Sequence, residues 1–237
     1  VNASLHVCGR WAVKKTASMV FLYGSKVYYD RTTGLATIKW GVGRFYIGTV
    51  AKDAAAADTT VDVFLNGNQQ NVTELGGVWE EGGGFSSSVT EGLGVTFGNN
   101  LVTLAFDAVS EAALAALIAN RGVDIDDGPI FELELGIFDI GGNAVIDFNF
   151  GLATSAHATD FDSAAQYVAV HLDGASLVIN TQSKDGANNV AAQTAGVSVV
   201  DDTYYLWQFD CRDKSNIKIY RDGVLLAGAA ALHLNAF

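Results

Sequence analysis

The stretch GSKVYYDRTTGLATIKWGVGRFYIGTVAKDAAAADTTVDVFLNG, residues 24–67, carries the pattern that decides the fold of the first part of this chain. Branched and aromatic residues recur in short runs, and turn-forming residues separate each run from the next. We expect strands over residues 25–29, 35–40, 44–50 and 59–65. Residues 30–34 have the chemistry of a hairpin turn that ends in a glycine suited to positive φ. The stretch therefore predicts antiparallel β-structure.

The last of these runs shows the alternation most clearly. Val61, Val63 and Leu65 fall on one face of a strand, and Asp62 and Phe64 fall on the other. A further strand is expected over residues 5–13. Together these runs predict a small antiparallel β domain over residues 1–67.

The rest of the chain predicts a second, larger β domain over residues 85–237, after a linker at residues 68–84 that is rich in Gly, Asn and Gln. Strands are expected over residues 94–97, 101–107, 130–140, 144–150, 166–172, 176–181, 190–200, 203–211 and 216–221. One short helix is also expected, with Ser110 as its N-cap and Gly122 after its end. The fold class is therefore all-β, a small antiparallel domain followed by a two-sheet jelly-roll sandwich with one short helix.

The composition excludes several classes of protein and partner. Hydrophobic residues make up 49% of the chain and charged residues only 17%, which is the opposite of a disordered composition. No apolar run approaches the roughly 18 residues that a membrane-spanning helix needs, so no membrane partner is expected. A net charge of −12 argues against nucleic acid as a partner, because phosphate binding depends on clustered Lys and Arg.

The charge is divided unevenly along the chain. Residues 1–70 carry eight basic and four acidic side chains, a net charge of +4, and the remaining residues carry six basic and 22 acidic ones, a net charge of −16. Either the two parts face different surroundings, or both are solvated surfaces whose charge has no electrostatic purpose.

Residues 24–67 resemble the carboxyl-terminal half of a family of small tailed-phage proteins that decorate capsids. The matching positions are Gly24, Val27, Tyr28, Tyr29, Asp30, Ile47, Gly48, Val50, the turn over residues 52–58, Val61, Val63, Leu65 and Asn66. The Gly-rich amino-terminal half usual in the family is absent, and the chain starts without Met. We therefore expect an amino-terminal part of this domain to precede Val1.

The resemblance implies a capsid decoration, or cement, protein on the outer surface of a phage head. Its partner would be the major capsid protein, and such proteins commonly occupy threefold positions, so a homotrimer is expected. Aromatic residues are dense in the first part, and together with its basic excess they predict an assembly surface. The residues expected to contact the capsid or a neighbouring protomer are Arg10, Trp11, Lys14, Lys15, Trp40 and Arg44.

The segment TYYLWQFDCRDKSNIKIYRDGVLLAG, residues 203–228, resembles the closing hairpin of concanavalin-like, laminin-G-type jelly rolls. Asp222 and Gly223 form a good hairpin turn there. This fold hosts lectins, glycosidases and structural modules, so the resemblance leaves a second function open. The alternative is a carbohydrate-binding adhesion module that recognises glycans.

No residue pattern predicts catalysis, a cofactor or a metal site. Glu132 and Glu134 share a strand face and Asp139 follows them, but a solvated acidic face explains these carboxylates better than a glycosidase pair does. The acidic loop of Asp124, Asp126 and Asp127 lacks the calcium-binding EF-hand pattern, and Asp160 and Asp162 form an acidic loop of the same kind. The four histidines are His6, His157, His171 and His233, and none lies in a catalytic or metal motif. Cys8 and Cys211 are expected to be buried free thiols rather than a disulfide.

Overall fold

In the computed structural model, residues 9–65, 85–90, 94–98, 101–105, 114–119, 124–137, 147–154, 161, 163–173 and 176–235 are described. The structure divides into two compact units. Unit 1 consists of residues 1–73 together with two later segments, Tyr205–Gln208 and Tyr220–Leu225, and unit 2 contains the remainder. The expected linker at residues 68–84 lies outside the described residues.

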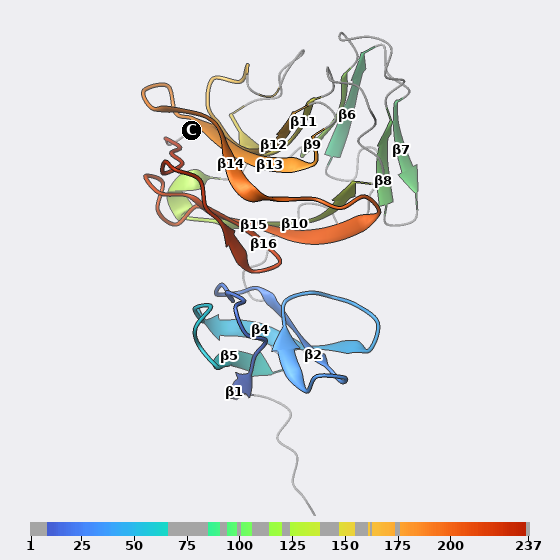
Figure 1. Cartoon of the computed structure of the whole chain (residues 1–237), viewed down its shortest axis with the longest axis vertical. Helices are drawn as coiled ribbons and strands as arrows, with labels where there is room; N and C mark the ends of the chain where they lie inside the picture. The colour runs from blue at the N-terminus through green and yellow to red at the C-terminus, as the bar shows by residue number, and fades with distance from the viewer. Residues whose placement is uncertain are drawn as a thin grey trace, which may run out of the picture. The chain divides into compact units, whose positions relative to one another are not determined.

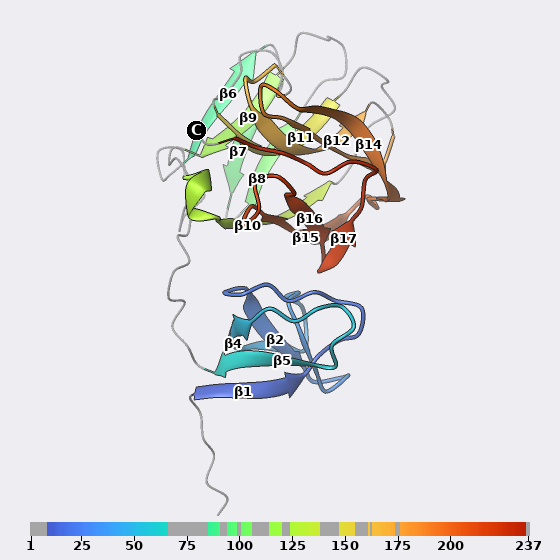
Figure 2. The ribbon, with the colours of Figure 1, turned by 90° about the vertical axis from the view of Figure 1, so that its left-hand side faces the viewer.

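The main element of unit 1 is a five-stranded antiparallel sheet in the order β1-β5-β4-β2-β3 (Figures 1 and 2). Its strands are β1 (Gly9–Lys14), β2 (Lys26–Asp30), β3 (Leu35–Thr37), β4 (Arg44–Lys52) and β5 (Thr60–Leu65). All five coincide with strands expected from the sequence. The all-β prediction is confirmed for this part of the chain.

One face of this sheet covers the core of unit 1. Val61 and Val63 are fully buried, as the alternation predicted, and Val27, Val50, Phe21 and Ile38 pack with them. Leu206, from one of the later segments of unit 1, also packs against this cluster. Burial of these branched side chains is the main free-energy gain that holds the sheet together.

The later segments make specific hydrogen bonds inside unit 1. The backbone N–H of Val20 donates to the carbonyl of Gly223 at 2.8 Å. The Gln208 amide donates to the Ser25 hydroxyl at 3.0 Å, and both residues are buried. The amide nitrogen of Gln208 therefore finds a polar partner in the core, where an unsatisfied donor would destabilise the fold.

Unit 2 contains two four-stranded sheets, in the orders β10-β15-β16-β17 and β11-β12-β13-β14. The strands are β10 (Ile130–Ile137), β11 (Asp147–Ala153), β12 (Tyr167–Asp173), β13 (Val178–Lys184), β14 (Asn189–Ser198), β15 (Thr203–Asp210), β16 (Lys218–Arg221) and β17 (Val224–Leu226), and parts of β15 to β17 are assigned to unit 1. Phe209 of β15 lies 5.8 Å from Phe131 and 6.3 Å from Phe150 of β11, measured between ring centroids. Because Phe150 belongs to the other sheet, these rings pack between the two sheets, as in a sandwich.

Two further pairs of strands precede the sandwich. β6 (Phe85–Thr90) pairs with β9 (Leu114–Ala119), and β7 (Gly94–Gly98) pairs with β8 (Leu101–Ala105). The prediction of a helix after Ser110 was wrong over residues 114–119, which form β9. Ala and Leu are strong helix formers, but intrinsic propensity amounts to less than about 1 kcal/mol per residue, and pairing of the backbone with β6 outweighs it. The helical element among the described residues is a single turn of 3₁₀-helix at Ile125–Asp127.

Candidate capsid-binding surface

The face of the unit 1 sheet that points away from the core is cationic and aromatic. The strand register places Arg10 opposite Phe64, Lys14 opposite Thr60, and Lys52 opposite Asp62. Thr60, Asp62 and Phe64 alternate along β5 with the buried Val61 and Val63, so they point to the outer side of the sheet. Their partners on the neighbouring strands point to the same side. On β2 and β4 the same face carries Lys26, Tyr28, Asp30, Arg44 and Tyr46.

We call this surface the outer sheet face and define it by Arg10, Lys14, Lys26, Tyr28, Asp30, Arg44, Tyr46, Lys52, Asp62 and Phe64. It contains five cationic side chains and two carboxylates. Arg10 donates two hydrogen bonds to one oxygen of Asp62, at 2.5 and 3.2 Å, and Lys14 and Lys52 are exposed. The face therefore has an excess of positive charge that is available to an acidic partner.

Aromatic side chains lie among these cations. Tyr28 and Tyr46 pack edge to face with ring centroids 6.0 Å apart, and burial raises the pKa of Tyr46 above its ordinary value. Tyr46 and Phe64 are nevertheless each 41% exposed. Large aromatic rings in partial contact with water, beside cations, are typical anchors of protein interfaces.

The structure distributes the six expected contact residues over several positions. Arg10, Lys14 and Arg44 lie on the outer sheet face. Trp11 lies opposite Val63, on the core side of the edge strand β1, and is 46% exposed. Trp40 lies in the loop between β3 and β4 and is 63% exposed. Lys15 is placed differently from the expectation.

Lys15 is buried, and its expected role as a surface contact is corrected. Its ammonium donates to the carbonyl of Met19 at 2.6 Å and lies 5.4 Å from the centre of the Phe21 ring. Burial lowers the pKa of Lys15, and the nearby charge of Asp58 acts in the opposite direction. The side chain thus fastens the loop after β1 to the core, and we leave Lys15 out of the contact surface.

Phe64, Lys26 and Lys52 belong to the same surface but were not among the expected contacts. Phe64 could have been found, because the alternation around Val63 already placed it beside Asp62 on the outer face of the strand. Lys52 could not, because an irregularity between Val50 and Lys52 shifts the pairing of β4 with β5 by one residue.

Arg44 connects the outer sheet face to the loop that carries Trp40. Its Nε donates to Asp30 at 2.9 Å, and one of its terminal nitrogens donates to the carbonyl of Lys39 at 3.3 Å. The other oxygen of Asp30 accepts from the backbone N–H groups of Thr32 and Thr33. The Arg44 side chain, followed by these backbone groups, holds the pKa of Asp30 below its ordinary value.

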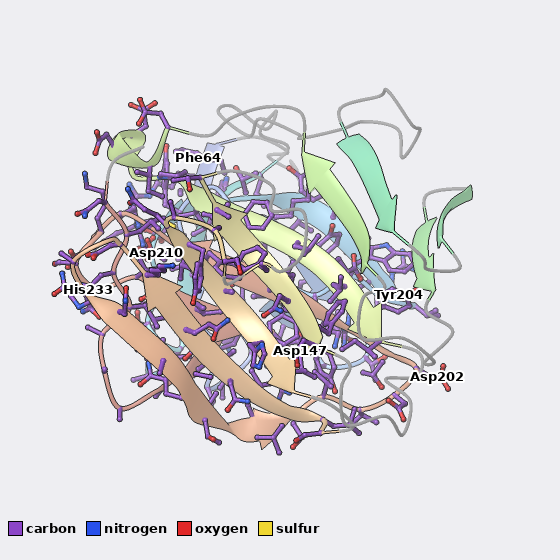
Figure 3. The ribbon with its side chains drawn as sticks, turned by 90° about the horizontal axis from the view of Figure 1, so that it is seen from above. Phe64, Asp147, Asp202, Tyr204, Asp210 and His233 are labelled. Carbon is purple, nitrogen blue, oxygen red and sulfur yellow. The ribbon has the colours of Figure 1, made fainter. Side chains whose placement is uncertain are left out.

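The candidate chemical groups of unit 2 form no catalytic or metal centre in the part of the chain that the structure describes. Glu132 and Glu134 lie two residues apart on β10, while Asp139, Asp160 and Asp162 lie outside the described residues. Figure 3 shows Asp147, Asp202 and Asp210 at separate places. The described residues contain no group of three or more His, Cys, Asp or Glu side chains arranged to bind a metal ion.

The remaining candidates have structural surroundings. Asp124 caps the turn at Ile125–Asp127, and Asp126 forms an ion pair with Lys214. His171 shares a hydrogen bond of 2.8 Å with Asn149, and the backbone N–H of His233 donates to Ser183. Cys211 is a buried free thiol, as expected, and burial raises its pKa to about 12, so it is unreactive at neutral pH. Cys8, His6 and His157 lie outside the described residues.

Among the described residues, no helix is both long enough and apolar enough to cross a membrane. Comparison with curated proteins gives no match, and comparison with solved structures gives none. A family model described as phage cement protein matches residues 1–65. These residues include all five strands of the unit 1 sheet and every residue of the outer sheet face. The match supports a capsid cement segment over residues 1–65 and, with it, a structural, capsid-associated role.

Proposed function

We propose that this protein is a capsid cement protein that binds the outer surface of a phage head through unit 1. The observation that carries the proposal is the family match, which covers the segment that bears the outer sheet face. The partner would be the major capsid protein. A cement protein that binds the mature lattice, and not its precursor, stabilises the mature lattice by mass action.

The charge of the chain supports this arrangement. Unit 1 offers cations and aromatic rings on one face, which suits a capsid surface that is acidic around apolar patches. The part of the chain after residue 70 carries a net charge of −16, and we propose that it remains in solvent, where like charge keeps decorated particles apart. The expected homotrimer is also part of the proposal, and light scattering of the purified protein measures it directly.

Charge reversal at Lys14 tests the proposed surface. Lys14 is exposed on the outer sheet face, and Lys14→Glu changes the local charge by two units without removing a buried contact. We expect binding to expanded, undecorated shells to weaken about threefold to tenfold at low salt, with the difference shrinking as salt screens the charges.

The matched control is Lys218→Glu, which makes the same change at an exposed lysine of unit 2. Both variants are first compared with the natural protein by thermal unfolding. If both substitutions weaken binding to the shells equally, binding depends on the net charge of the protein and not on the outer sheet face. Unchanged occupancy of the shells by Lys14→Glu would count against this surface.

Glycan binding by unit 2 is the alternative that the sequence leaves open. A glycan platform would present several exposed aromatic rings beside amides or carboxylates on one face. Among the described residues of unit 2, Tyr204 is the one aromatic side chain among the large exposed hydrophobic residues, at 37% exposure. The described structure thus favours no glycan site, and we propose none.

A further inference from the structure

The loop between β3 and β4 displays apolar side chains to solvent. Trp40 is 63% exposed and Val42 is fully exposed, although Ile38, two residues before Trp40, is buried in the core. Leaving most of Trp40 and all of Val42 in water forgoes much of a hydrophobic gain that is roughly 1.5–3 kcal/mol for a fully buried apolar side chain. Such exposure is what an interface residue shows before its partner arrives.

Hydrogen bonds fix the backbone of this loop, although the side chains of Trp40 and Val42 are exposed. The Arg44 side chain donates to the carbonyl of Lys39, and the Arg44 backbone donates to the carbonyl of Gly41 at 3.1 Å. At the end of the loop that leads into β4, the carbonyl of Gly43 accepts from the backbone N–H of Arg31 at 3.2 Å. These bonds fix both arms of the loop, so little conformational entropy remains to be lost when Trp40 and Val42 bind.

Three cations lie next to the loop, and two of them form ion pairs, Arg44 with Asp30 and Lys39 with Asp222. The third, Arg31, lies over the Phe45 ring, 5.2 Å from its centre, and its backbone bonds the loop at Gly43. Arg31 thus gives the surroundings of the loop an excess of positive charge, and complementarity favours a partner with carboxylates beside an apolar pocket.

We infer that Trp40 and Val42 form an apolar anchor that inserts into an acid-rimmed pocket on the capsid subunit, with Arg44 as the residue that positions the loop. This inference rests on the proposed function and adds to it a second kind of contact. The outer sheet face supplies long-range attraction, which is sensitive to salt. The anchor supplies short-range burial, which is not.

The experiment compares binding of the full chain to undecorated shells at several salt concentrations. The double substitution Trp40→Ser with Val42→Ser is expected to weaken binding about tenfold or more, with the same salt dependence as the natural protein. Lys14→Glu is expected to reduce the salt dependence itself. Val200→Ser, at a valine of unit 2 that is 59% exposed, is the matched control for Val42→Ser and should bind as the natural protein does.

Positioning by Arg44 has its own readout. Arg44→Ala removes the side-chain bonds to Asp30 and to the Lys39 carbonyl but keeps the backbone bonds of the loop. Binding should weaken while tryptophan fluorescence anisotropy falls, because the Trp40 ring moves more freely. Arg44→Lys restores the charge but not the paired bonds to Asp30 and Lys39. It should therefore recover only part of the binding.

The outcomes separate the two proposals. If the natural protein does not bind shells at any salt concentration, the proposed function fails. If the natural protein binds and the double substitution binds equally well, the anchor is overturned and the function stands. If the double substitution lowers the mass of the protein alone in light scattering, the loop contacts a second copy of this chain, and the capsid pocket is likewise overturned.

Discussion

Gly48 of β4 and Gly151 of β11 share an unusual backbone conformation in two different sheets. Each has a φ angle near the limit of the region that favours glycine, +152° for Gly48 and +155° for Gly151. A Cβ atom at Gly48 would lie 1.9 Å from the carbonyl oxygen of Phe64, and one at Gly151 would lie 2.1 Å from that of Val168. In both sheets the neighbouring strand approaches closely because no side chain stands between the strands.

Substitution at Gly48 therefore tests the described register of β4 against β5. Gly48→Ala should destabilise unit 1 by about 3 kcal/mol or more, because the new methyl group overlaps backbone that cannot move aside. Gly43→Ala is the control, since its φ angle is also positive but nothing lies within 4 Å of the added Cβ, and it should cost only about 1 kcal/mol. Calorimetry measures the loss of unfolding free energy in both variants. Equal losses for Gly48→Ala and Gly43→Ala would contradict the described pairing of β4 with β5.

Asp30 links the turn after β2 to the loop after β3, because it bonds the turn directly and the loop through the Arg44 side chain. One carboxylate oxygen accepts from the turn and the other accepts from Arg44. The folded-state pKa of Asp30 lies below its ordinary value, so this carboxylate contributes stability above about pH 4. The contribution disappears as the pH falls through the lowered pKa.

Asp30→Asn tests this linkage. The amide oxygen still caps the turn, but the charge that holds Arg44 is lost, so the variant should melt at a lower temperature than the natural protein at pH 7. The difference should narrow as the pH falls from about 4 through the lowered pKa of Asp30, where the carboxylate of the folded protein becomes protonated. Asp201→Asn, at an exposed turn, should melt like the natural protein. A difference that stays constant down to pH 2.5 would contradict the assigned role of Asp30.

At the scale of elements, alternation predicted the strands well and helix propensity did not predict β9. A half-buried strand is predicted by Val61, Val63 and Leu65 alone, because the alternation of apolar and polar residues is complete within one strand. β9 has the sequence LAALIA, which suits a helix or a buried strand equally. Only its pairing with β6, which is distant in the sequence, determines its conformation.

At the scale of the whole molecule, the sequence predicted a cationic and aromatic surface in outline, but not which residues form it. The excess of cations and aromatic residues in the first part pointed to an assembly surface, and Arg10 and Lys14 lie on one cationic face. Lys15 follows Lys14 in the sequence and points to the opposite side, into the core. Its position depends on carbonyl groups of the loops after β1 and β4, which no local pattern reveals.

The proposed function gives a role to the charge division between residues 1–70 and the rest of the chain. Under that proposal, the basic face binds an acidic capsid surface, and the acidic remainder limits contact between particles. A cement protein acts through many copies, so its effect is a property of the decorated shell and not of one molecule.

The most direct test of this account is the disruption temperature of expanded, undecorated shells, measured by calorimetry with increasing amounts of the full chain. We expect the temperature to rise and to level off at a fixed number of bound copies per shell, as counted by cosedimentation. An unchanged disruption temperature at concentrations that saturate the shells, or the absence of saturable binding, would contradict the cement function.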